Sequence, residues 1–174
     1  MLEIDGLSKK KVYDVMRELL YSASYAWHTT EHFVRAKHPE LLMGEGYFKV
    51  NEDFGSYEAK RLSKALGISE NGIDGLIQVL KYSHWAVFEH IEVKKLTENS
   101  FRMRTIGCSS QQTAKKWGME YYDCRLQGLR ARSGFFKTLN NKATVERIFS
   151  PPEVRLENIP GNVSCEWLVS IKQS

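Results

Sequence analysis

Three cysteines, Cys108, Cys124 and Cys165, are the residues of this chain whose chemistry is most open to interpretation. They could pack in the core, ligate a metal together, or react as thiols. Structural zinc usually takes cysteines in local pairs about two to four residues apart, and these three are far apart in the sequence. A site for zinc or iron would therefore need separate elements to converge, with a residue such as His32 as the fourth ligand.

Cys124 is the strongest candidate for a reactive thiol. It stands near the start of a predicted helix, between Asp123 and Arg125. A helix N-terminus and a nearby cation both favour the thiolate form, so Cys124 is predicted to act as a nucleophile or as a ligand. Cys165 alternates with Trp167 along a predicted strand, so a place in the core is the simpler interpretation for its small, apolar side chain.

The run His28-Thr29-Thr30-Glu31-His32 is the second candidate centre. Its H-x-x-E-H spacing is that of inverted zinc peptidases, and on a helix both histidines share one face with Glu31 beside them. The short chain and its order of elements do not resemble those peptidases. A metal site of another kind and a polar helix face both remain open, and in a hydrolase His28 or His32 would transfer protons.

Aromatic side chains form the third signal. Five of them could line a cavity between helices and sheet, where a small-molecule ligand would bind: Trp27, Trp85, Trp117, Tyr122 and Trp167. Ligand pockets are typically concave and mostly apolar, with a few converging polar groups. Ordinary core packing is the alternative, because aromatic residues dominate cores as well.

These residues need a scaffold, and hydrophobic spacing predicts one. Helices are expected over residues 9–37, 51–66, 73–80, 109–117 and 124–139, and strands over 85–95, 101–105, 144–149 and 163–171. The predicted fold is α+β, an N-terminal helical layer followed by a β-β-α-α-β-β unit with an antiparallel sheet. Residues 1–174 are expected to form one domain, mainly helical over 1–84 and sheet-containing over 85–174, with the sheet burying the helices' apolar stripes.

Composition limits the classes of function. The chain has 174 residues, 42% hydrophobic and 26% charged, which is ordinary for a globular domain. No apolar run suits a membrane span, and the first residues lack a signal peptide, so a cytoplasmic location with reduced thiols is expected. The net charge of +4 is mild and forms no basic stripe, so nucleic acid is not an expected partner. No phosphate loop, serine elbow or dinucleotide fingerprint supports nucleotide chemistry.

Several segments together resemble a known family. They are residues 58–68, the run from Cys108 through Gln111 to Gly118, Pro151-Pro152-Glu153 and Cys165-Glu166-Trp167. The combination resembles an uncharacterised family of small cytosolic proteins from bacteria and archaea. That family is distantly similar to the L-2-amino-thiazoline-4-carboxylic acid hydrolase group and to 4-vinyl-reductase-type ligand-binding domains. Members often carry two further cysteines near the Pro-Pro step, where this chain has Arg147 and Ser150.

Three hypotheses follow. The favoured one is a small-molecule-binding protein with a pocket between helices and sheet. The second, implied by the resemblance, is a hydrolase that uses Cys124 or a Cys/His-bound metal. The third is a structural protein that forms a homodimer through its N-terminal helices and leaves an apolar stripe on the first of them.

Overall fold

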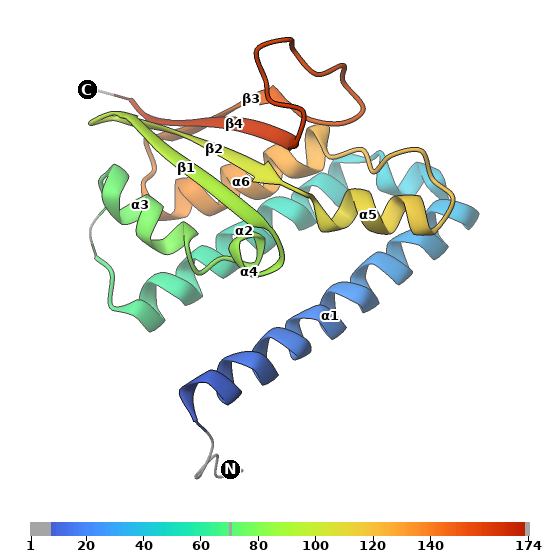
Figure 1. The fold of residues 1–174 in the computed structure, drawn as a ribbon, viewed down its shortest axis with the longest axis horizontal. Coiled ribbons are helices and arrows are strands. Elements are labelled where there is room, and N and C mark those ends of the chain that lie inside the picture. The colour runs from blue at the N-terminus through green and yellow to red at the C-terminus, as the bar shows by residue number, and fades with distance from the viewer. Residues whose placement is uncertain (1–7, 70, 173–174) are drawn as a thin grey trace.

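The computed structural model describes residues 8–69 and 71–172, and its fold is α+β with an antiparallel sheet, as predicted (Figure 1). The elements in chain order are α1 (Lys9–Lys37), the 3-10 helix η1 (Pro39–Leu42), α2 (Glu45–Leu66), α3 (Ile73–Leu80), α4 (His84–Phe88), β1 (His90–Thr97), β2 (Ser100–Ile106), α5 (Ser109–Lys116), α6 (Arg125–Leu139), β3 (Ala143–Phe149) and β4 (Val163–Ile171).

The sheet has the strand order β1-β2-β4-β3, and all its neighbours are antiparallel. Strands β1 and β2 form the predicted hairpin. In β4 four of the five residues predicted for one face, Val163, Cys165, Trp167 and Val169, are buried, and Ile171 is half-buried. Glu166 on the other face is also buried, where it pairs with Arg104. Because side chains alternate along a strand, one face of β4 points towards the helices, and Cys165 and Trp167 lie on this face.

Helix α6 packs against both β3 and α2, so it lies between the sheet and α2 (Figure 1). Two glycines let α2 and α6 touch backbone to backbone. A Cβ atom added at Gly55 would lie 2.0 Å from the carbonyl oxygen of Ala131, and one at Gly134 would lie 2.1 Å from that of Glu52. Any larger side chain would separate the helices, so this crossing fixes the position of α6.

Helix α1 is held far less closely. Ser8 caps it by accepting a hydrogen bond from the Lys11 N–H at 3.2 Å, but Glu31 is its one buried residue. The expectation that the sheet buries its apolar stripe is wrong, because the backbone of α1 comes close to η1 and α4 rather than to a strand, and Leu19 and Phe33 stay exposed. Neither α1 nor any other described helix has the length and apolar character of a membrane span.

Two predicted boundaries were also wrong. Residues 85–88, the start of the strand predicted over 85–95, belong to α4, and β1 begins only at His90. The His84 N–H donates to Glu58 at 2.7 Å, and the three-residue spacing of Trp85 and Phe88 suits a helical turn as well as a strand. Helix α2 begins at Glu45 rather than residue 51, with Gly46 inside its first turn.

Candidate functional site

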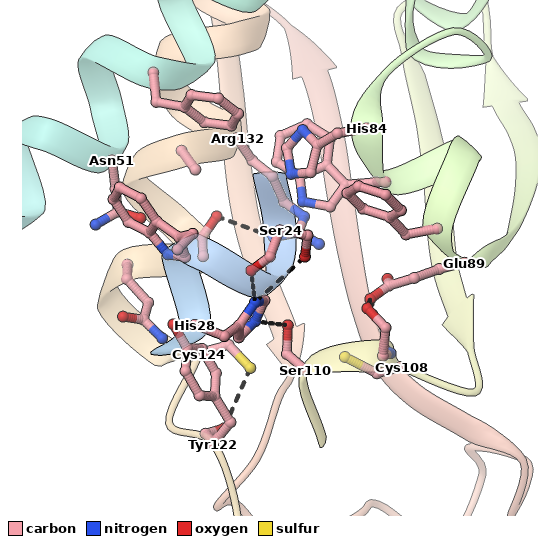
Figure 2. A pocket seen from close by; sticks show the side chains of 18 of the residues that line it. Ser24, His28, Asn51, His84, Glu89, Cys108, Ser110, Tyr122, Cys124 and Arg132 are labelled. Atoms are coloured by element: carbon pink, nitrogen blue, oxygen red, sulfur yellow. Dashed lines mark hydrogen bonds between the residues drawn. The ribbon is translucent and has the colours of Figure 1, made fainter. Parts of the chain in front are cut away.

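A cavity of about 380 Å³ lies between α1, α2, α4, α5, α6 and β4 (Figure 2). Its volume falls within the range of small-molecule sites, about 300–1,000 Å³. Six large aromatic side chains line it: Trp27, Phe54, Trp85, Phe88, Tyr122 and Trp167. Polar groups from His28, Ser110 and Arg132 share the walls. Such a space can hold an apolar molecule and orient it by a few polar contacts.

Four of the five aromatics predicted for ligand binding lie at this cavity, namely Trp27, Trp85, Tyr122 and Trp167. The fifth, Trp117, stacks against His32 with the ring centroids 4.8 Å apart. Both line a separate pocket of about 10 Å³, which has space for at most one water molecule. Trp117 therefore lies outside the cavity, while ligand contact by the other four stays a prediction.

The three cysteines also converge on the cavity, although the sequence separates them widely. The predicted fourth metal ligand, His32, does not line it. Among residues 8–69 and 71–172, no group of three or more His, Cys, Asp or Glu side chains is placed to hold a metal ion. The predicted set of Cys108, Cys124, Cys165 and His32 is thus not assembled, and zinc or iron binding stays a prediction.

Cys124 occupies the N-cap of α6 as expected, but its electrostatics are the reverse of our prediction. Burial, followed by the neighbouring Cys165, raises the pKa of the Cys124 thiol to about 12, although Arg132 acts to lower it. Burial also raises the pKa of Cys108. The Cys124 thiol donates to the Tyr122 carbonyl at 3.3 Å. A thiol with this pKa is protonated at neutral pH, which argues against the predicted thiolate, and a catalytic or ligating role for Cys124 stays a prediction.

His28 is held in a defined tautomer at the cavity wall (Figure 2). Its Nδ1 lies 2.8 Å from the carbonyl oxygen of Ser24, and because a carbonyl can only accept, Nδ1 carries the proton. In the neutral ring Nε2 is then an acceptor. The Ser110 hydroxyl lies 3.2 Å from Nε2 and donates to it. A serine hydroxyl within hydrogen-bond distance of an imidazole nitrogen is the arrangement of a nucleophile and its base.

His84 has a carboxylate partner. Its Nδ1 lies 2.8 Å from Glu58 Oε2, and the ring packs on Trp85 at 4.3 Å between centroids. A carboxylate on one ring nitrogen fixes the orientation of a histidine ring. His84 lines the cavity, and the sequence did not suggest its pairing with Glu58.

Glu31 does not line the cavity, and its carboxylate instead makes structural contacts that hold α1. Its carboxylate accepts from the Tyr47 hydroxyl at 2.9 Å and from the Tyr122 hydroxyl, and it pairs with Arg35 at 3.1 Å. Burial, followed by Glu31, raises the pKa of both tyrosines. The H-x-x-E-H run is consequently divided, with His28 at the cavity and Glu31 binding α1 to the body.

Arg132 is the residue that the sequence analysis missed. It is 5% exposed, and its guanidinium lies 4.7 Å from the Trp85 ring centroid and 4.4 Å from that of Trp167. Its Nη1 donates to the Gly128 carbonyl at 3.2 Å. The available signal was its position on α6 among apolar and small residues, since it is one residue from Ala131 and three from Phe135.

Comparison with known proteins places most of this structure in a family. The model of a family of unknown function (DUF6125) matches residues 47–171. This segment runs from the first turn of α2 to the end of β4. Helix α1 lies outside the match, although Ser24, Trp27 and His28 form part of the cavity wall. No curated protein and no solved structure matches the chain.

Proposed function

We propose a ligand-binding function for this chain, which belongs to the family of unknown function DUF6125. The ligand is a small, largely apolar molecule held in the cavity between α1, α4, α6 and β4. The observation that supports this is the cavity itself, about 380 Å³ in volume, with walls that are mainly aromatic. The resemblance to 4-vinyl-reductase-type ligand-binding domains supports the same function. We expect the protein to bind a metabolite in the cytoplasm.

Titration with N-phenyl-1-naphthylamine, a neutral dye that fluoresces in apolar sites, tests this function. Ala23→Trp on α1 puts a large side chain at the cavity wall, whereas Ala26→Trp on the same helix lies outside it. We expect one dye per wild-type chain, binding weakened at least about tenfold by Ala23→Trp, and unchanged binding in Ala26→Trp. Equal binding by all three proteins, or none by the wild type, would overturn the proposal.

A hydrolase is the second candidate, and the Ser110–His28 contact at 3.2 Å favours it. This pair replaces Cys124, whose thiol is protonated, as the source of a nucleophile. The resemblance to the aminothiazoline-carboxylate hydrolase group agrees with such an activity. Hydrolysis of p-nitrophenyl butyrate tests this activity. We expect Ser110→Ala and His28→Gln to abolish turnover, and Ser22→Ala on the exposed face of α1 to leave it intact. Turnover unaffected by Ser110→Ala would exclude this pair.

A further inference from the structure

We infer that the ligand of this cavity carries a carboxylate group and that Arg132 binds it. The inference rests on the proposed ligand-binding function and adds the chemical class of the ligand. Arg132 lines the cavity and is buried almost completely. A buried charge normally has a partner of opposite sign, because burial without one is strongly unfavourable.

Arg132 has no such partner within the described residues. Fifteen contacts between acidic and basic groups are present in the part of the chain that the structure describes, and none includes Arg132. Its Nε is buried and has no hydrogen-bond partner there. The two indole rings compensate part of the charge, but they cannot accept the hydrogen bonds of its edge.

The faces of the guanidinium and one of its nitrogens already have neighbours. Trp85 and Trp167 each lie within 4.7 Å of the guanidinium, and Nη1 is bound to the Gly128 carbonyl. The remaining edge carries Nε and Nη2, which together form the fork that binds the two oxygens of a carboxylate. We place the carboxylate at this edge, where it would provide the partner that the buried Nε lacks, and the aromatic walls would take the apolar part of the same molecule.

The charges around the cavity favour a carboxylate over a phosphate. Among the lining residues, all of them described, Arg132 is the only Lys or Arg, while Glu89 is an acidic member. The Glu89 carboxylate accepts from the N–H and the hydroxyl of Ser109 at 3.2 and 3.1 Å. His28 and His84 are the other titratable nitrogen groups of the wall. A single guanidinium matches one negative charge, whereas a phosphate dianion usually takes several cationic groups.

Displacement of bound N-phenyl-1-naphthylamine from the wild-type protein tests the ligand class with three probes of equal ring size. They are 1-naphthoate, its neutral amide 1-naphthamide, and 1-naphthyl phosphate. We expect 1-naphthoate to bind at least about tenfold more tightly than the other two. Equal affinity for the acid and the amide, or tighter binding of the phosphate, would overturn the inference while leaving the ligand-binding function intact. Failure of the dye itself to bind would instead refute that function.

Variants on α6 then test the role of Arg132. Arg132→Met keeps an unbranched side chain without the charge, and we expect it to abolish the preference for acid over amide. Arg132→Lys keeps the charge but loses the fork, so its preference should be intermediate. Arg130→Met is the matched control, because Arg130 does not line the cavity and is paired with Glu45 and Glu52 on α2. An acid preference that survives in a folded Arg132→Met or Arg132→Lys protein at the wild-type level would overturn the assignment.

Discussion

Burial controls the chemistry of single residues in this protein more strongly than their sequence neighbours do. Cys124 stands at a helix N-terminus beside Arg125, which should favour a thiolate, yet burial raises its pKa to about 12. Arg132 is a buried cation rather than a buried thiol, and its charge has no carboxylate partner among the described residues.

The raised pKa of Cys124 predicts a loss of stability in alkali. The unfolded chain releases the thiol proton near the ordinary value of 9.0, whereas the folded chain keeps it to about 12. Deprotonation between these values favours the unfolded state, so this contribution is complete below pH 9 and declines above it. We expect the urea-unfolding free energy of the wild type, relative to Cys124→Ser, to fall as pH rises from 9 towards 12. A pH-independent difference would contradict this.

Trp167 is fully buried in β4. Trp167→Ala should reduce the free energy of unfolding by about 3–5 kcal/mol, the range for large aromatic side chains removed from cores. Urea denaturation followed by circular dichroism measures the loss. Trp27→Ala is the control, because Trp27 is 43% exposed and its removal should have a much smaller effect. A Trp167→Ala protein as stable as the Trp27→Ala protein would refute the role of β4 in the core.

The sequence predicted part of the candidate site. Aromatic content pointed to Trp27, Trp85, Tyr122 and Trp167, and all four line the cavity. Arg132 could not be found this way, because its two indole neighbours belong to α4 and β4, and a sequence alone does not show which residues meet across elements. The same reason hid the pairing of His84 with Glu58, which joins α4 to α2.

At the scale of elements, the crossing of α2 and α6 makes the sharpest stability prediction. Gly55→Ala would place a methyl group 2.0 Å from the Ala131 carbonyl oxygen, so the helices must separate, at an expected loss of about 2 kcal/mol or more. Gly46→Ala, on the same helix, meets nothing within 4 Å and should change stability by less than about 1 kcal/mol. Thermal unfolding distinguishes them, and equal melting temperatures would contradict the close crossing.

The attachment of α1 depends on Glu31. Glu31→Gln removes the charge that pairs with Arg35 and weakens the contacts with Tyr47 and Tyr122, at an expected loss of about 1–3 kcal/mol. Hydrogen exchange should accelerate in α1 and remain slow in α6. The control is Glu18→Gln, because Glu18 is exposed on α1. Unchanged exchange in Glu31→Gln would show that other contacts hold the helix.

Element boundaries followed the sequence where a local signal defines them. Ser8 caps α1 and Gly67, at a positive φ of 65°, ends α2, both as expected. The alternation along residues 163–171 predicted β4 correctly. The prediction was wrong at residues 85–88 because a short apolar run suits either a strand or a helix, and only the tertiary contact between His84 and Glu58 decides in favour of α4.

For the whole molecule, the predicted homodimer remains to be measured. Leu19, Tyr25 and Phe33 on α1 are each more than 60% exposed, which agrees with the apolar stripe that this hypothesis required. If α1 pairs with a second copy, light scattering after gel filtration should give twice the monomer mass, and Leu19→Glu combined with Phe33→Glu should restore the monomer. A monomeric wild type at high micromolar concentration would refute the homodimer.

The unequal attachment of the cavity walls has a consequence for what the protein accepts. The wall formed by α6 is fixed by Gly55 and Gly134, whereas the wall formed by α1 has one buried residue, Glu31. One wall of the cavity is thus held by close helix packing and the other mainly by contacts between side chains. If the proposed carboxylate ligand binds, the α6 wall with Arg132 would recognise its head group, and the α1 wall would set how much the apolar part of accepted molecules can vary in size.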